Sequence, residues 1–265
     1  MTDMTLFLQA FAVAGGVFVL LWPVSLALKD VGVVDAWWGP GFFVSLLIVW
    51  WLSGAPSDGR SVLLLALVGL WSTRLGLVMV RRWLSHVEED RRYQLVRKGW
   101  GRAFWWKSLF IVFVLQGVLQ FLIALGPMSA ITAEAAPLGA LAMIGAALAL
   151  SGLALEAVAD IQLDRFKATA PRDALCTTGL RAHIRHPNYT GEMTFWVGIW
   201  LIGAEVAPWW AALSPILVIL LLTRVSGAPM IAEVMKRTRP EFADYSTRTP
   251  AFFPSFQRPT ASATK

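Results

Sequence analysis

Residues 137–158 read PLGALAMIGAALALSGLALEAV, a stretch in which Glu156 is the only charged side chain. A helix needs about 20 mostly apolar residues to cross the hydrocarbon core of a bilayer, so this stretch predicts a membrane-spanning helix. The composition of the whole chain agrees, because 57% of its 265 residues are hydrophobic, only 15% are charged, and the mean hydropathy is +0.60. Soluble domains carry about 25% charged residues. The sequence therefore predicts an all-α polytopic membrane protein and excludes a soluble globular enzyme.

Six further segments are apolar in the same way. The seven expected spans cover residues 5–28, 37–53, 61–81, 104–125, 137–158, 190–204 and 208–228. Tryptophan pairs mark the ends of several spans: Trp37–Trp38, Trp105–Trp106 and Trp209–Trp210. Such pairs are typical of the membrane–water interface. Gly126-Pro127 predicts a turn after the fourth span. We expect a single domain, a seven-helix bundle, over residues 1–256 and a flexible tail at 257–265.

The basic residues lie almost entirely on one side of this topology. Arginines and lysines fill the first, third and fifth loops and the C-terminal tail, whereas Arg60 is the only one on the opposite side. Loops rich in Lys and Arg stay in the cytoplasm, so we expect the N-terminus outside and the C-terminus inside. The net charge of +6 is then a topology signal and requires no nucleic-acid partner. A polar cofactor would bind from the cytoplasmic side.

Several classes of site are excluded by what the sequence lacks. Cys176 is the only cysteine, so the chain can form neither an internal disulfide nor a cysteine-rich metal site. Three histidines supply too few ligands for a metal cluster, and we expect no metal. The glycine patterns of phosphate-binding loops and dinucleotide-binding folds are also absent.

Ionisable side chains at membrane depth are costly unless they are paired or hydrated, so each one is a functional candidate. Arg74 lies in the third span, two turns deeper than Arg81. It is either a structural arginine or a contact to a phosphate or substrate. Asp35 lies in VDAWWG (34–39), where the second span begins. It either caps that helix, the commoner role, or is a carboxylic acid that donates a hydrogen bond to a substrate carbonyl.

The fifth span ends in a stripe of charged side chains: Glu156, Asp160, Asp164 and Lys167. Spacings of three and four residues place them on one face of a helix. The stripe is either a solvated or arginine-paired face, or it binds ribose hydroxyls. Gln116 and Gln120 in the fourth span are expected to form interhelical hydrogen bonds. The segment EEDRRY (88–93) is expected to be a solvated loop.

The densest group of polar side chains is RAHIRHPNYTGE, residues 181–192. Cationic side chains and two imidazoles precede a Pro-Asn turn at the start of the sixth span. Basic and amide donors near the start of a helix favour an anionic group such as a phosphate. His183 and His186 alone would make a weak metal pair.

Together, five motifs resemble a bacterial family of membrane proteins, DUF1295, which is grouped with steroid 5-alpha-reductases and related sterol reductases. The motifs are VDAWWG (34–39), EDRRY (89–93), AVADIQLDRFK (157–167), RHPNYTGE (185–192) and VSGAP (225–229). The resemblance to DUF1295 covers nearly the whole chain, whereas the likeness to steroid reductases is concentrated in the C-terminal half. It implies a seven-helix bundle in the bacterial inner membrane that holds NADPH in a cytoplasm-facing cavity. Hydride would pass to a polarised C=C bond in a hydrophobic lipid, sterol or isoprenoid substrate.

The resemblance also implies roles for individual residues. The implied cofactor-binding set is Arg74, Arg91, Tyr93, Asp160, Asp164, Lys167, Arg185, His186, Asn188, Tyr189, Glu192 and Tyr245. Asp35, Trp71 and Arg74 are the implied catalytic residues. Steroid reductases have a tyrosine where this chain has Trp71 and a glutamate in the first hairpin, for which Asp35 is the nearest carboxylate. The cofactor residues therefore match better than the substrate residues.

Two other functions stay open. The pattern Arg-His-Pro-x-Tyr-x-Gly also resembles isoprenylcysteine and phospholipid methyltransferases, which bind S-adenosylmethionine. The acidic stripe and Arg74 favour the reductase over this alternative. A non-enzymatic transporter or scaffold is the second alternative, but transport would place charges along a pathway open to both sides, whereas the charges here gather at the cytoplasmic end.

Overall fold

Of the residues that the structure describes, 82% are helical and none lies in a strand. A computed structural model describes residues 3–85, 89–171 and 174–254, and the predicted tail at 257–265 lies outside them. The chain divides into two units, the first formed by residues 1–149 and 196–218, the second by residues 150–195 and 219–265. The all-α prediction is confirmed.

Six helical runs among the described residues are long and apolar enough to cross a membrane. They are Asp3–Leu28, Val31–Leu52, Gly59–Ser85, Arg91–Thr132, Ala140–Thr169 and Trp209–Thr238. Each contains one of the predicted spans or most of it. The remaining prediction, 190–204, corresponds to helix α8 (Pro187–Gly203), which at 17 residues is too short to be counted with them. A seventh crossing and the orientation of the termini stay predictions.

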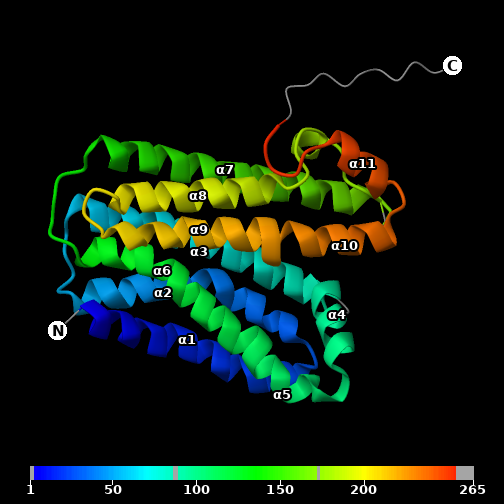
Figure 1. Cartoon of the computed structure of the whole chain (residues 1–265), viewed down its shortest axis with the longest axis horizontal. Coiled ribbons are helices and arrows are strands. Elements are labelled where there is room, and N and C mark those ends of the chain that lie inside the picture. Colours follow the sequence, from blue (N-terminus) through cyan, green and yellow to red (C-terminus); the bar gives the residue numbers. More distant parts are fainter. Residues whose placement is uncertain (1–2, 86–88, 172–173, 255–265) are drawn as a thin grey trace. The chain divides into compact units, whose positions relative to one another are not determined.

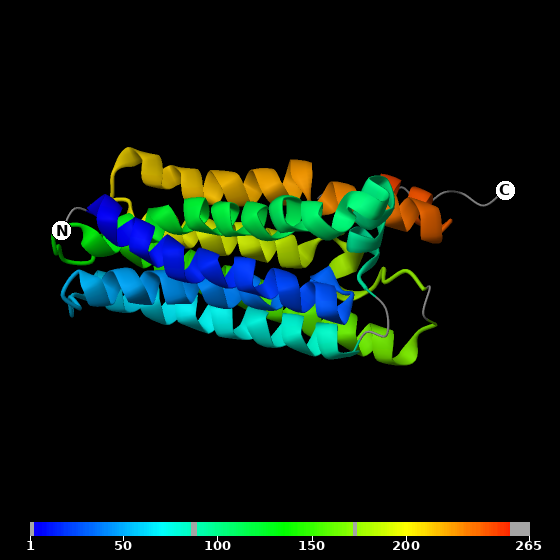
Figure 2. The same ribbon diagram turned by 90° about the horizontal axis from the view of Figure 1, so that it is seen from below.

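Helix α2 is the centre of the first unit. It packs against α1, α3 and α6, which run lengthwise beside it (Figures 1 and 2). The helical elements that lie wholly in this unit are α1 (Asp3–Leu28), η1 (Val31–Val34), α2 (Asp35–Leu52), α3 (Gly59–Ser85), α4 (Arg91–Trp100), η2 (Gly101–Ala103), α5 (Phe104–Ser108), η3 (Leu109–Val114), α6 (Leu115–Thr132) and η5 (Trp209–Ala212).

Two glycines let the neighbours of α2 approach its backbone. A Cβ atom on Gly39 would lie 3.1 Å from the backbone oxygen of Ser72 on α3. A Cβ atom on Gly41 would collide with the amide of Gln120 on α6, which donates a 2.6 Å hydrogen bond to the Trp38 carbonyl. The predicted interhelical role of Gln120 is confirmed. Small residues at such contacts are typical of helix packing in membranes.

The predicted turn at Gly126-Pro127 is wrong, because α6 continues through both residues to Thr132. Gly126 instead marks a close contact, since a Cβ atom there would lie 2.8 Å from the Cβ of Ser214 and 2.9 Å from the carbonyl oxygen of Ala211. Glycine and proline both occur within membrane helices when neighbouring groups form hydrogen bonds with the backbone groups that are left free. The dipeptide therefore allows a helix contact and does not end the helix.

Arg60 is almost completely buried at one end of the first unit, with 2% of its surface exposed. Its guanidinium pairs with Glu205 at 2.9 Å and donates a 2.9 Å hydrogen bond from Nε to the Ile202 carbonyl. It also donates to the carbonyls of Ala136 and Pro137 in the connection that follows α6. This one side chain therefore ties together three segments that are far apart in the sequence.

Helices α7 (Ala140–Thr169) and α8 approach each other closely at two levels. In the second unit, a Cβ atom on Gly152 would lie 2.5 Å from the carbonyl oxygen of Gly191. In the first unit, a Cβ atom on Gly145 would lie 2.6 Å from the carbonyl oxygen of Gly198. Each helix thus carries two glycines seven residues apart, the spacing at which side chains return to the same face. Any larger residue at these positions would separate the helices.

The second unit holds the C-terminal end of α7, the start of α8 and the last helices of the chain. Its further elements are η4 (Gly179–Ala182), the end of α9 (Leu213–Leu220), η6 (Leu221–Val225), α10 (Ala228–Thr238) and α11 (Phe242–Arg248).

Candidate functional site

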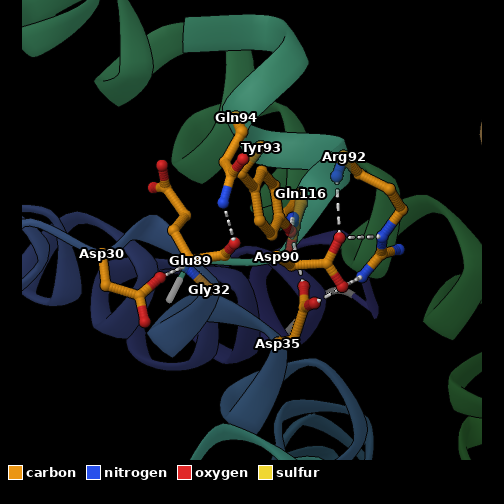
Figure 3. A network of polar contacts seen from close by, with 9 residues as sticks. All are labelled: Asp30, Gly32, Asp35, Glu89, Asp90, Arg92, Tyr93, Gln94 and Gln116. Atoms are coloured by element: carbon orange, nitrogen blue, oxygen red, sulfur yellow. Dashed lines mark hydrogen bonds and ion pairs between the residues drawn. The ribbon is translucent and has the colours of Figure 1, made fainter. Parts of the chain in front are cut away.

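The side chain of Asp35 joins the start of α2 to α4 (Figure 3). Tyr93 donates a 2.6 Å hydrogen bond from its hydroxyl to Oδ1 of Asp35, and Arg92 donates from Nη2 to Oδ2 at 3.0 Å. On the other side, Gln116 of α6 donates a 3.2 Å hydrogen bond to the Tyr93 hydroxyl oxygen. The predicted interhelical role of Gln116 is confirmed. Three helices therefore meet at one carboxylate–tyrosine pair.

The capping role favoured for Asp35 is wrong. An N-cap residue has extended backbone angles, whereas Asp35 is already helical with φ −64° and ψ −25°. The 3-10 turn η1 precedes it, and Asp30 caps that turn by accepting a hydrogen bond from the Gly32 amide at 2.8 Å. The 3-10 turn η1 leads directly into α2, so Asp35 does not cap that helix. Its carboxylate points toward α4 instead.

Arg92 is the cation that pairs with Asp35, and it was not among the predicted site residues. The predicted cofactor contact of Arg91 stays a prediction. Asp90 caps α4 by accepting from the Arg92 amide at 2.8 Å, and its carboxylate also pairs with Arg92 Nε at 3.1 Å. Arg92 is thus held between Asp90 and Asp35, whereas Arg91 is exposed. A carboxylate at the start of a span needs a cation nearby, and this is the signal by which a basic partner for Asp35 could have been sought.

A second polar group lies beside the first (Figure 3). Glu89 accepts from the Val31 amide at 3.0 Å and binds Arg97 through both carboxylate oxygens, at 2.7 and 2.8 Å. Asp30 accepts a 2.9 Å hydrogen bond from the indole of Trp83. The prediction of a solvated loop is wrong for residues 89–93, and Glu88 lies outside the described residues. These charges hold η1, and with it Asp35, against α3 and α4.

Trp71, predicted to be catalytic, is fully buried in a cluster of aromatic rings. Its ring contacts Phe42 at 5.6 Å and Trp196 at 5.3 Å between centroids, both edge to face. Trp38 extends the cluster along α2 through Phe42, at 5.5 Å. Arg74, one turn further along α3, is half-buried. The structure therefore places Trp71 in an aromatic wall of the first unit, and the chemical roles of Trp71 and Arg74 stay predictions.

In the second unit, the start of α8 combines aromatic rings with arginines. His186 and Tyr189 stack with 5.4 Å between ring centroids and 16° between ring planes. Arg185 lies with its guanidinium carbon 5.8 Å from the ring centroid of Phe242, and its buried Nε atom has no hydrogen-bond partner among the described residues. Arg181 is buried and donates a 3.1 Å hydrogen bond to the Ala159 carbonyl of α7. The side chains offer positive charge and a flat aromatic surface.

The segment after α11 pairs with the backbone at the start of α8. Pro250 accepts from the Arg185 amide at 2.9 Å, and Ala251 accepts from the His186 amide at 3.0 Å. Tyr245 lies nearby and donates a 2.6 Å hydrogen bond from its hydroxyl to the Arg181 carbonyl. These two backbone amides are therefore occupied, so an anion at this point would be bound by side chains. Both amides precede α8, so the expectation of basic and amide donors at the start of that helix stays a prediction.

The other predicted cofactor residues of the second unit lie on the same two helices. Along the α7 stripe, Glu156 is buried, Asp160 is half-buried, and Asp164 and Lys167 are exposed. Gly191 of α8 leaves room for Glu156, because a Cβ atom there would lie 2.8 Å from its Cγ. The positions on α8 that were predicted to contact the cofactor and are half-buried are Asn188, Tyr189 and Glu192.

Burial keeps two groups of this unit neutral near pH 7. Burial, together with the positive charges of Arg185 and Arg181, lowers the pKa of His186 to about 4. Burial also raises the pKa of the Tyr245 hydroxyl. The imidazole of His186 is thus an uncharged stacking partner, and the arginines carry the positive charge.

Within residues 3–85, 89–171 and 174–254, no group of three His, Cys, Asp or Glu side chains is arranged to hold a metal ion. The predicted site residues fall into two groups. Those of the first unit are Asp35, Trp71, Arg74, Arg91 and Tyr93; those of the second are Asp160, Asp164, Lys167, Arg185, His186, Asn188, Tyr189, Glu192 and Tyr245.

Comparison with known proteins places the chain in a family. A search of curated proteins found no match, and a search of solved structures found none either. Among protein-family models, the one described as "Protein of unknown function (DUF1295)" matches residues 21–249. The matched region contains both groups of site residues, from Asp35 to Tyr245. The chain therefore belongs to the DUF1295 family.

Proposed function

We propose that this protein is a membrane-embedded reductase that uses NADPH to reduce a polarised C=C bond in a hydrophobic lipid, sterol or isoprenoid. The observation that carries the proposal is the 2.6 Å hydrogen bond between Tyr93 and Asp35 at the end of an apolar bundle. Relationship to steroid 5-alpha-reductases is part of this proposal. So is a site that faces the cytoplasm from the bacterial inner membrane, with the N-terminus outside.

The Tyr93–Asp35 pair has the chemistry that an enone reduction needs. When a β-carbon receives a hydride, negative charge develops on the carbonyl oxygen, and a positioned acid stabilises it. The Tyr93 hydroxyl sits between Asp35 and Gln116, so it can exchange one of these partners for a substrate oxygen. Arg92 balances the charge of Asp35, which then holds or returns the proton.

The side chains of the second unit suit the phosphate groups of a nucleotide cofactor. Bound NADPH supplies the hydride. Arg185 has a buried Nε atom that lacks a hydrogen-bond partner in the described part of the chain, which suits a phosphate oxygen. The stacked rings of His186 and Tyr189 offer a flat surface. The half-buried carboxylate of Asp160 on α7 would accept a hydrogen bond from a ribose hydroxyl.

The cofactor is the first thing to test. Purified protein in detergent should gain thermal stability from NADPH and none from S-adenosylmethionine. Stabilisation by S-adenosylmethionine alone would overturn the reductase in favour of a methyltransferase, and stabilisation by neither would argue against both enzymes. Asn188→Ala should weaken the NADPH effect, while Asp35→Asn should leave it intact.

The reaction can be tested without knowing the substrate. NADPH labelled with deuterium at C4 is incubated with the protein and a bacterial lipid extract, and the lipids are analysed by mass spectrometry. We expect a lipid that gains one deuterium and one hydrogen, which is the mass change of a reduced C=C bond. Tyr93→Phe should abolish this product. No deuterium transfer to any lipid, by protein that binds NADPH, would refute the proposed reaction.

A further inference from the structure

The chain makes a sharp bend between α4 and α5, which we call the α4–α5 elbow (residues 97–107). Gly101 ends α4 with a φ of +51°, a conformation that glycine adopts without strain. As Figures 1 and 2 show, α4 runs across the ends of the neighbouring long helices, whereas α6 runs beside them. If these helices cross the bilayer, α4 lies parallel to its surface.

The length of this helical run supports the same placement. The run Arg91–Thr132 has 42 residues. A straight helix of that length would measure about 63 Å, whereas the hydrocarbon core of a bilayer is about 30 Å thick. The elbow therefore lies where the run leaves the hydrocarbon core.

The outer side of the elbow combines exposed cations with exposed tryptophans. Lys98 and Arg102 are exposed, as are the rings of Trp100, Trp105 and Trp106, at 45%, 58% and 44%. The sequence has no acidic residue between Asp90 and Glu134, and no carboxylate in the described part of the chain pairs with Lys98 or Arg102. Tryptophan prefers the headgroup layer, and clustered basic residues attract anionic lipids.

The contacts of Arg97 and Lys107 show which of the cations near the elbow pairs with a carboxylate of the protein. Arg97 is bound by Glu89 and stacks over Phe104, with its guanidinium carbon 4.4 Å from the ring centroid. Lys107 instead places its ammonium 3.9 Å from the ring centroid of Trp100 and 5.5 Å from that of Trp106. Arg97 is thus neutralised by a carboxylate, whereas among the described residues the ammonium of Lys107 contacts only aromatic faces.

We propose that the α4–α5 elbow is a docking surface for anionic phospholipid headgroups. Lys98, Arg102 and Lys107 bind the headgroup phosphate, and the three tryptophans lie beside the glycerol backbone of the lipid. The inner face of α4 carries Tyr93 and Arg92, so a headgroup bound to the elbow also steadies the helix that contacts Asp35. Lipid binding at the elbow is independent of the proposed reductase activity, because it requires no turnover.

Lipid binding is measured by native mass spectrometry on protein in detergent, titrated with phosphatidylglycerol or phosphatidylcholine. The elbow variant carries Lys98→Gln, Arg102→Gln and Lys107→Gln. The control variant carries Lys236→Gln, Arg237→Gln and Arg248→Gln, which remove the same charge from exposed positions on α10 and α11. A basic side chain near an anionic surface contributes roughly a fivefold change in affinity.

Wild-type protein should bind phosphatidylglycerol at least tenfold more tightly than phosphatidylcholine. The elbow variant should lose this preference, and the control variant should keep it to within about twofold. Equal losses in the two variants, or none in the elbow variant, would overturn the proposal. Soluble glycerol phosphate at the same concentration should not compete; competition as strong as that of the lipid would show a site for a free phosphate compound and would also overturn it.

A second measurement does not depend on how the charge variants fold. Gly99 has no atom within 4 Å of where a Cβ would lie, so a nitroxide fits there after Gly99→Cys in a Cys176→Ser background. In phosphatidylglycerol vesicles, collision rates with oxygen and with a water-soluble nickel complex should place the nitroxide at headgroup depth. Collision rates equal to those of a nitroxide in bulk water would overturn the proposal.

Discussion

Tyr93 and Asp35 are 58 positions apart in the sequence, yet the tyrosine hydroxyl donates a 2.6 Å hydrogen bond to the carboxylate. The contact exists because Asp90 starts α4 next to Arg92, and Arg92 and Tyr93 then project together toward the first residue of α2. An acid supported in this way by a cation and an amide is the chemical centre of the proposed reaction.

Removing the acid should stop turnover and leave cofactor binding intact. General acids contribute roughly 100-fold to 10,000-fold to a rate, so Asp35→Asn and Tyr93→Phe should each lower deuterium transfer from labelled NADPH by at least 100-fold. The NADPH-induced rise in melting temperature should be unchanged in Asp35→Asn. Full activity in either variant would remove that residue from the catalytic role.

Arg92→Met should destabilise the first unit, because it leaves Asp35 and Asp90 with no cation between them. Removing one member of a buried pair costs about 3–5 kcal/mol, but Arg92 is one-third exposed, so we expect about 2 kcal/mol. The double variant Arg92→Met with Asp35→Asn should recover part of this loss. Thermal unfolding in detergent measures both, and Arg91→Met, at an exposed position, is the control.

Arg60→Met should be among the most destabilising single changes at the opposite end of the first unit. It leaves the carboxylate of Glu205 without its cation and the carbonyl of Ile202 without its guanidinium donor. We expect a loss of about 3 kcal/mol, and a smaller one for Glu205→Gln, because Glu205 is 29% exposed and the guanidinium keeps its backbone acceptors. A melting temperature in Arg60→Met equal to that of the wild type would contradict this account of the contact.

The close approach of α7 and α8 predicts opposite effects for two glycine substitutions. Gly152→Ala places a Cβ atom 2.5 Å from the Gly191 carbonyl, so the helices must separate, at about 2 kcal/mol. Gly16→Ala on α1 meets nothing within 4 Å and should be neutral or stabilise the helix by up to about 1 kcal/mol. The melting temperatures of the two variants are measured side by side. A loss in Gly152→Ala alone shows that helix packing causes it, whereas equal losses would show that glycine-to-alanine changes destabilise these helices in general.

Stability should decrease on acidification because of His186. Its pKa is about 4 in the folded protein and 6.5 when unperturbed, so the unfolded chain binds a proton more readily. The contribution is fully present above pH 6.5 and is lost as the pH falls toward 4, by up to about 3 kcal/mol. Melting temperatures from pH 7.5 to 4.5 should fall less steeply in His186→Phe than in the wild type. Parallel curves would show that this imidazole does not titrate as described.

The sequence predicted the helices well and their contacts poorly. Apolar length located the long helical runs, because that signal is local and strong. It failed at Gly126-Pro127, where the same dipeptide that makes a turn in water is accommodated inside a helix by its neighbours. Helix termini and partners depend on residues that are distant in the chain, and composition does not reveal them.

In the candidate site, too, the sequence did not show which residues contact one another. Asp35 was selected because a carboxylate at membrane depth is costly, and Tyr93 through the family resemblance. Arg92 was not predicted, because the sequence does not show which of two adjacent arginines faces Asp35. The segment at residues 249–252 could not be predicted, since it pairs with α8 through backbone atoms that every residue type possesses. Glu89 was assigned to solvent although it holds the backbone of η1.

The contact of Arg60 with Glu205 has a consequence for biogenesis. The two residues are separated by 145 positions, so the ribosome completes five of the six long helical runs before the carboxylate is made. Until then the guanidinium lacks its carboxylate partner, and only the carbonyls of Ala136 and Pro137, water or lipid phosphate can accept its hydrogen bonds. One end of the first unit is therefore closed late in synthesis, and a truncated chain that stops before α8 is expected to expose this arginine and to be recognised by membrane quality-control proteases.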